Sequence, residues 1–343
     1  MKGKYHIVIQ NNKLHYELDI KRNITIIKGD SATGKTTLIG LIDRASRMGI
    51  SSGISIACKK KCRTLNDMDW QLILSHTKEN IIFVDEDNLF IRTKEFAQAV
   101  KESDNYFVII CREDLPHLPY SVEEIYGIHT SGKYNDLKRT YNELYKIYAN
   151  TKIQKKDLPI TPKEVITEDS NSGHQFFNAI CKEKNINCIS AGGKSNIRKI
   201  LDKTDGNNVL VIADGAAIGP EMNKLYQHMR LHDTTNLYLP ESFEWMILKA
   251  GVISGISIQS ILEHPEEYID SKKYMSWERY FTNLLIENTK DTFLKYNKGS
   301  LNESYLQERI KNSILNIMEG ISWYSNYKKF ERTGIMLKQF HVK

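Results

Sequence analysis

The sequence of 343 residues has few cysteines, no long apolar run and no secretion signal at its start. Its five cysteines have no regular spacing, which favours a reducing compartment over a disulfide framework or a zinc site. No stretch reaches the roughly eighteen apolar residues that a membrane-spanning helix needs. The first residues lack the apolar core of a signal peptide. We therefore expect a cytoplasmic protein with no membrane partner.

The composition is that of a globular protein with a mildly basic charge. Apolar residues make up 41% of the chain and charged residues 26%. The formal net charge of +6 permits contact with DNA or RNA but does not require it. The length is sufficient for two domains and a small third one.

One glycine-containing segment has the full pattern of a phosphate-binding loop (P-loop). It comprises Gly29, Asp30, Ser31, Ala32, Thr33, Gly34, Lys35 and Thr36, followed by Thr37. Residues 23–28 predict a buried strand before it, and residues 37–42 predict the first turns of a helix after it. This order points backbone N–H groups into one concavity. We predict that residues 29–37 bind ATP, with Lys35 at the β- and γ-phosphates and Thr36 beside Mg²⁺.

A second motif supplies the carboxylates that a P-loop ATPase needs. Residues 81–84 predict a buried strand, and Asp85 and Glu86 follow it. We predict that Asp85 holds Mg²⁺ through its waters and that Glu86 is a catalytic residue that polarises the attacking water. Residues 105–111 predict a third buried strand whose end lies beside the γ-phosphate. Arg112 is then a candidate phosphate sensor, and the alternative is an ordinary surface arginine.

The first half predicts a small, mainly parallel sheet preceded by a hairpin. The predicted strands are 5–9, 14–20, 23–28, 54–57, 81–85, 105–111 and 124–128. A hairpin that leads directly into a P-loop strand resembles the start of ABC-type ATPases. The Leu-Ser-Gly-Gly signature of those ATPases is absent between the two motifs. Because that segment completes a neighbour's nucleotide site, we predict a minimal P-loop domain without the usual sandwich dimer.

The pattern changes after this domain. Apolar spacing over 134–149 predicts a helix, and two prolines with a charge run over 152–162 predict a linker. We divide the chain into an ATPase domain (1–150), a linker (151–162), an α/β domain (163–262) and a helical region (263–343). In the last region an apolar stripe that begins at Trp277 is expected to be core. The tail over 327–332 interleaves basic and aromatic residues, a pattern that can bind nucleic acid, and the alternative is a surface tail.

Three predicted strands of the second half end in carboxylates: Glu168, Asp214 and Glu241. The carboxyl ends of parallel strands form the edge at which α/β sheets bind ligands. If these strands are neighbours, the three acids converge and need a cation such as Mg²⁺ or Mn²⁺. We predict that they are metal ligands, and such a site could hold a phosphodiester and activate water.

The same residues carry a resemblance. Glu168 after the first strand, Gly192-Gly193-Lys194 after the second and Asp214 after the third resemble a TOPRIM domain over residues 163–250. The segment is most similar to the divergent TOPRIM-like domains of OLD-family nucleases and of partners of phage-defence ATPases. The resemblance implies Mg²⁺-dependent cleavage or joining of nucleic acid, with Glu168 as the catalytic acid/base and the later acids as metal ligands.

The chain departs from the TOPRIM pattern on the third strand. TOPRIM domains usually carry Asp-x-Asp there, whereas this sequence has Ala216 at the second position. Glu221 and Asp169 are candidates to replace it. After the next strand, Glu241 and Glu244 fit the family's acidic segment loosely. A non-catalytic TOPRIM fold and a general α/β domain stay open as alternatives.

We therefore expect an α/β protein that binds and hydrolyses ATP and controls a metal-dependent nuclease, or a nuclease remnant. The combination resembles bacterial defence against phage. One alternative is a nucleotide-dependent switch or scaffold whose C-terminal half binds a partner without catalysis, and another is a phosphotransferase. A protein partner or a second copy of the chain is also expected, because P-loop ATPases often need a residue in trans.

Overall fold

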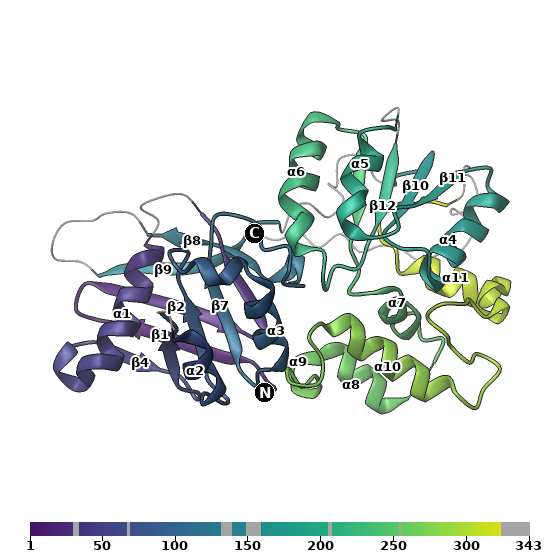
Figure 1. The fold of residues 1–343 in the computed structure, drawn as a ribbon. Helices are drawn as coiled ribbons and strands as arrows, with labels where there is room; N and C mark the ends of the chain where they lie inside the picture. The colour runs from purple at the N-terminus through teal and green to yellow at the C-terminus, as the bar shows by residue number, and fades with distance from the viewer. Residues whose placement is uncertain are drawn as a thin grey trace, which may run out of the picture.

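The computed structural model describes residues 1–29, 34–66, 69–131, 139–148, 159–204, 208–253 and 255–323. It is a mixed α/β structure with a large sheet of nine strands and a small sheet of four strands. Figure 1 shows the large sheet and its helices on one side of the molecule, with the small sheet and the C-terminal helices on the other.

The large sheet has the strand order β4-β1-β2-β9-β8-β3-β7-β6-β5. The strands are β1 (Tyr5–Gln10), β2 (Leu14–Ile20), β3 (Ile24–Ile27), β4 (Ser55–Ala57), β5 (Cys62–Thr64), β6 (Ile81–Val84), β7 (Tyr106–Ile110), β8 (Ile125–Thr130) and β9 (Thr140–Lys146). The five strands from β8 to β5 are parallel. Both faces of β3, β6 and β7 are buried, which explains their continuous apolar runs.

Helices cover both faces of the large sheet. Helix α1 (Lys35–Met48) shares a buried cluster with β1 and β2. Helices α2 (Trp70–Ser75) and α3 (Lys94–Glu102) pack on the opposite face. Short 3₁₀ turns complete this half: η1 (Gly49–Ser52), η2 (Leu89–Arg92) and η3 (Val122–Glu124).

The predicted hairpin is confirmed, because β1 and β2 pair antiparallel from Tyr5 to Ile20. The predicted strand over 54–57 exists as β4, but it pairs antiparallel with β1 at the sheet edge and lies outside the parallel core. Its place in the parallel block is taken by β5, which the sequence pattern did not indicate.

The predicted helix over 134–149 is wrong for its described part, where residues 140–146 form β9. This strand joins the hairpin to the parallel block, since it pairs with β2 on one side and β8 on the other. Tyr141 and Tyr145 alternate with inward residues and are half-exposed. Their spacing fits a helix too, but the open edges of β2 and β8 provide backbone partners only for a strand. Residues 132–138, 149 and 150 lie outside the described residues.

The small sheet has the order β11-β10-β12-β13, and all its neighbouring strands are parallel. The strands are β10 (Glu164–Thr167), β11 (Asn187–Ser190), β12 (Val209–Ile212) and β13 (Thr235–Tyr238). They alternate along the chain with α4 (Ser172–Glu183), η5 (Lys194–Asn196), α5 (Ile197–Leu201), η6 (Gly219–Glu221) and α6 (Met222–Leu231). The predicted alternation of strands and helices in the second half is therefore confirmed.

The C-terminal helices follow the small sheet, and several of them share one buried apolar cluster with a face of that sheet. They are α7 (Phe243–Lys249), α8 (Ile256–Glu263), α9 (Pro265–Tyr268), α10 (Trp277–Thr289), η7 (Glu303–Leu306) and α11 (Glu308–Asn316). Trp277 and Phe281 of α10 are buried in one cluster with Phe176 of α4 and Val165 of β10. The predicted stripe is thus core. The predicted basic and aromatic tail over 327–332 lies outside the described residues.

One apolar core continues from the large sheet into the small one. Ile26 of β3 and Ile109 of β7 belong to the same buried cluster as Val211 of β12 and Met222 of α6. The strands of the two sheets lie on either side of the predicted linker, whose residues 151–158 are outside the described part. The two halves therefore pack as one body (Figure 1). Among the described residues, no helix is long and apolar enough to cross a membrane.

Candidate functional site

The loop after β3 is described at its two ends, Gly29 and Gly34 to Thr37; residues 30–33 lie outside the described part. Gly34 has a φ of 86°, in the left-handed region that favours glycine. The Lys35 side chain is buried, and its Nζ donates a hydrogen bond of 2.6 Å to the Gly29 carbonyl. Lys35 therefore reaches back across the mouth of the loop.

Tyr16 of β2 supports this loop and was missed from the sequence. Its hydroxyl donates to the Gly34 carbonyl at 2.9 Å, and a Cβ at Gly34 would lie 2.8 Å from that hydroxyl oxygen. Burial raises the pKa of Tyr16 to about 12, against the opposing effect of a hydrogen bond with Thr37. Thr36 and Thr37 stand exposed in the first turn of α1. The hairpin thus fixes the junction of loop and helix.

The predicted acidic pair stands at the carboxyl end of β6. Asp85 is buried, and its Oδ1 accepts the Glu86 backbone N–H at 2.8 Å. Burial raises the pKa of Asp85, while that N–H and the Lys35 ammonium oppose the rise. Glu86 Oε1 lies 3.0 Å from Arg112 Nη2, so Arg112 contacts the predicted catalytic acid.

The strand order explains how these groups meet. β7 lies between β3 and β6, and all three are parallel, so the loop, Asp85 and Arg112 stand at the same sheet edge. The end of β7 therefore lies beside the loop, and its position next to the γ-phosphate stays a prediction. An ion pair between Lys28, which precedes Gly29, and Asp114 also connects the two strand ends.

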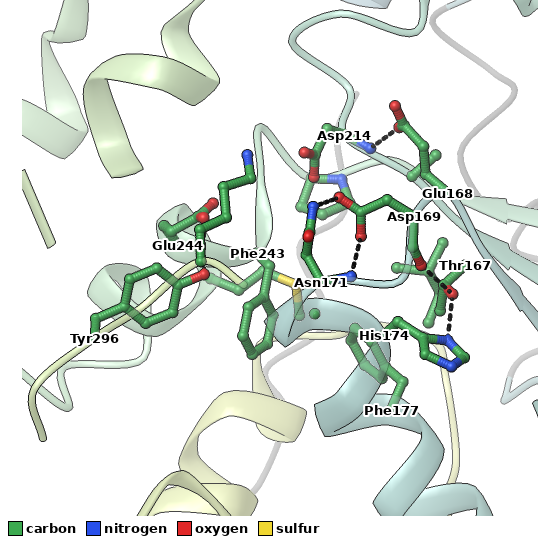
Figure 2. A pocket seen from close by; sticks show the side chains of 16 residues that line it. Thr167, Glu168, Asp169, Asn171, His174, Phe177, Asp214, Phe243, Glu244 and Tyr296 are labelled. Carbon is green, nitrogen blue, oxygen red and sulfur yellow. Dashed lines mark hydrogen bonds between the residues drawn. The ribbon is translucent and has the colours of Figure 1, made fainter. Parts of the chain in front are cut away.

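A second pocket lies at the carboxyl edge of the small sheet. Its lining comes from the ends of β10 and β12, from α4 and α7, and from Tyr296 and Lys298. The cavity volume of about 40 Å³ has room for about three water molecules. We call it the carboxylate pocket; Figure 2 shows its residues.

Glu168 and Asp214 meet in this pocket, as the sequence predicted. Glu168 follows β10, Asp214 follows β12, and the two strands are neighbours. The Asp214 backbone N–H donates to Glu168 Oε2 at 3.0 Å (Figure 2). Burial is the main cause that raises the pKa of Glu168 to about 7. Burial, followed by repulsion from Glu278, Glu168 and Glu244, raises the pKa of Asp214 well above its usual range.

A glycine holds Asp214 in place. The Gly215 N–H donates to the Pro240 carbonyl at 2.5 Å, which joins the ends of β12 and β13. A Cβ at Gly215 would lie 2.7 Å from the Leu239 carbonyl oxygen, so a larger residue would force two backbone segments apart. Only glycine permits this close approach.

Glu244 and Lys298 complete the lining of the pocket, and Glu278 stands behind the lysine; no sequence motif predicted Lys298. Tyr296 donates to Glu244 Oε1 at 2.8 Å, and the Lys298 ammonium pairs with Glu278 of α10. Burial disfavours the charge of Lys298, but attraction to Glu244, Glu278 and Asp214 outweighs it and raises the pKa of Lys298. Lys298 therefore neutralises part of the acidic cluster.

The lysine is presented by a loop that is fastened to the start of α4. Ser172 donates from its backbone N–H and from its Oγ to the Lys298 carbonyl, each at 2.8 Å. Asp169 also lines the pocket, and its carboxylate accepts both N–H groups of Asn171 (Figure 2). These contacts position the Asp169 carboxylate and the backbone at Lys298.

Glu241 does not join the other two predicted metal ligands. Its carboxylate accepts two hydrogen bonds from Arg22, at 2.5 and 2.9 Å. Arg22 precedes β3, lies 3.4 Å above the Trp277 ring and stands 3.4 Å from Glu124 Oε1. Glu241 thus joins the two sheets, because a buried arginine needs a carboxylate partner. Glu244, three positions later in the chain, faces the pocket in its place.

The donor set suits a hard divalent cation in type, since it consists of carboxylates. As the side chains stand, however, the described residues contain no group of three or more Asp, Glu, His or Cys side chains arranged to hold a metal ion. Lys298 provides a physical reason, because its ammonium pairs with Glu278 and is also attracted to Glu244 and Asp214. Binding of a cation would require Lys298 to withdraw from these carboxylates.

The raised pKa of Glu168 predicts a pH-dependent stability. The pKa rises from 4.5 to about 7 on folding, so the folded state holds this proton more tightly. The resulting stabilisation is complete below pH 4.5 and is lost as the pH rises through about 7, an effect on the order of 3 kcal/mol. In a chelator, thermal unfolding should occur at a lower temperature at pH 8 than at pH 5.5. In Glu168→Gln the unfolding temperature should depend less on pH. The same dependence of unfolding temperature on pH in both proteins would contradict this prediction.

No protein-family model matches the chain, and a search of curated proteins finds no match. The assignment of function therefore depends on the two sites described above.

Proposed function

We propose that the protein binds and hydrolyses ATP at the loop after β3, as a P-loop ATPase does. Four features at one sheet edge support this proposal: the glycine at φ 86°, the buried Lys35, the buried Asp85 and the Glu86–Arg112 pair. Lys35 would neutralise phosphate charge, and Glu86 would orient the attacking water. Thr36 and Asp85 would hold Mg²⁺ with the nucleotide.

We further propose that the carboxylate pocket is a TOPRIM-like site that cleaves a phosphodiester bond of DNA or RNA. The observation that carries this proposal is the meeting of Glu168 and Asp214, both with raised pKa values, in one pocket. A protein keeps mutually repelling, buried carboxylates at a cost in stability, and such groups gather at functional sites. A Mg²⁺ or Mn²⁺ ion held by Asp214 and Glu244, once Lys298 has withdrawn, would supply a Lewis acid and a bound water beside Glu168.

The residues of the pocket suit different proposed roles. A pKa of about 7 lets Glu168 accept a proton at neutral pH, which suits a general acid/base. Ala216 stands where TOPRIM domains carry a second aspartate, and it is buried in the apolar core beside α4 and α7. Glu221, a proposed replacement, pairs instead with Lys224 at 3.1 Å. Asp169 lines the pocket and is the better replacement.

A second candidate function is a nucleotide-dependent switch whose C-terminal half binds a partner without catalysis. The presence of Lys298 among the carboxylates and the apolar surroundings of Ala216 favour it. A role in phage defence, a partner protein and an oligomeric state stay predictions from the sequence. We rank the phosphotransferase last, because no acceptor motif is evident.

A cleavage assay separates the two proposals. Plasmid DNA and RNA are incubated with the protein, with and without ATP, in Mn²⁺ or in a chelator. The nuclease proposal expects metal-dependent cleavage that Glu168→Gln and Asp214→Asn each lower by roughly 100-fold or more. Asp233→Asn, at an exposed position, is the matched control and should cleave normally. Persistent ATP hydrolysis with no cleavage of either substrate would instead favour the switch.

A further inference from the structure

The segment of residues 111–122 connects the two sites, and we call it the crossover segment. It leaves the carboxyl end of β7 beside the loop after β3 and ends at η3, which leads into β8. β3 pairs parallel with β7 on one side and with β8 on the other. Because β8 therefore starts where β7 starts, the segment runs from the carboxyl ends of the parallel strands back to their amino ends. On this path it packs against the small-sheet half of the molecule.

The first end of the crossover segment contacts the nucleotide loop. Arg112 Nη2 lies 3.0 Å from Glu86, the predicted catalytic acid. Asp114 pairs with Lys28, which directly precedes Gly29. Both ionic contacts involve groups whose surroundings change when a nucleotide adds several negative charges at this edge. A change at the loop can therefore act on this end of the segment through two ionic contacts, at Arg112 and at Asp114.

The other end holds the backbone next to Asp214. The Gly215 carbonyl accepts hydrogen bonds from Ser121 Oγ at 3.1 Å and from the Val122 N–H at 3.0 Å. The Tyr120 carbonyl accepts the Gly219 N–H at 3.0 Å, and a Cβ at Gly219 would lie 2.2 Å from the Tyr120 ring. The small-sheet residues that follow Asp214 are thus bonded directly to the crossover segment.

The middle of the segment is packed rather than loose. Leu115, Leu118 and Tyr120 are each 1% exposed, and all three belong to the core that both sheets share. Packed segments shift as units, because their contacts do not deform continuously. A displacement at Arg112 and Asp114 would therefore move Ser121 as well.

We propose that the crossover segment couples the two sites, so that nucleotide binding at the loop after β3 changes the backbone at Asp214 in the carboxylate pocket. This inference rests on the proposed function of the nucleotide loop. It assigns the control of the pocket to contacts within one chain. If nucleotide binding changes the affinity of the pocket for its ligand by some factor, ligand binding in the pocket must change the affinity for nucleotide by the same factor.

Hydrogen–deuterium exchange of the full chain tests the coupling. Exchange at residues 211–217 is measured in Mg²⁺ alone and in Mg²⁺ with the non-hydrolysable ATP analogue AMP-PNP. The wild type should show a change in exchange rate of about fivefold or more on adding the analogue. Ser121→Ala removes the side-chain bond to Gly215, and Asp114→Asn weakens the pair with Lys28. Each variant should bind the analogue and lose most of the response.

Ser75→Ala, at an exposed position of α2, is the matched control and should respond as the wild type does. An analogue that binds the wild type without changing exchange at 211–217 would overturn the inference. A full response in both Ser121→Ala and Asp114→Asn would also overturn it, because the signal would then take another route. Failure of the analogue to bind at all would overturn the proposed ATPase function, and this inference with it.

Discussion

Replacing Lys35 with methionine is expected to lower the rate of ATP hydrolysis by roughly 100-fold or more. The Lys35 ammonium is buried at the mouth of the loop, 2.6 Å from the Gly29 carbonyl, and it opposes the rise in the pKa of Asp85 that burial causes. It is therefore the cation best placed to meet the β- and γ-phosphates. Methionine keeps an unbranched stem of similar length, so the fold should persist while the charge is lost.

Phosphate release from ATP is the measurement, with circular dichroism to check the fold. Lys199→Met is the matched control, because Lys199 is exposed on α5. It should hydrolyse ATP at the wild-type rate. Equal rates for Lys35→Met and the wild type would contradict the proposal that ATP is hydrolysed at the loop after β3.

Asp214→Asn is expected to abolish metal-dependent cleavage and, in a chelator at pH 8, to raise the unfolding temperature by a few degrees. Asp214 is the carboxylate whose charge the fold opposes most clearly, through burial and through repulsion by Glu278, Glu168 and Glu244. Asparagine has nearly the same shape without the charge. The substitution therefore relieves the repulsion and at the same time removes the ligand.

Differential scanning fluorimetry with and without Mn²⁺ separates these effects. The wild type should be stabilised by Mn²⁺, whereas Asp214→Asn should be more stable without the metal and unaffected by it. Asp233→Asn should behave as the wild type does. A loss of stability in Asp214→Asn under chelator would mean that Asp214 serves the fold and not a ligand.

Local sequence patterns predicted much of the fold because local chemistry decides it. Alternation around Asn11-Asn12 specifies the hairpin, and the apolar runs of β3, β6 and β7 can only be buried strands. β9 was missed because Tyr141 and Tyr145, four residues apart, fit the period of a helix as well as that of a strand. What selected the strand was the pair of open edges on β2 and β8, which are distant in sequence.

The candidate site was predicted in part for the same reason. Glu168 and Asp214 meet because they end neighbouring parallel strands, a relation that βαβ order allows one to expect. Glu241 follows the adjacent strand, but its carboxylate pairs with the buried Arg22 of the other sheet and does not face the pocket. Lys298 enters from a loop between helices, and no sequence rule places such a loop. Long-range contacts therefore decide which acids face the pocket.

Calorimetric titration of the metal-free, nucleotide-free protein with Mn²⁺ at pH 8 tests directly whether the carboxylate pocket binds a divalent cation. We predict saturable binding by the wild type and by Asp233→Asn, and its loss in Asp214→Asn. Binding that is unchanged in Asp214→Asn, or no binding by the wild type, would contradict the account.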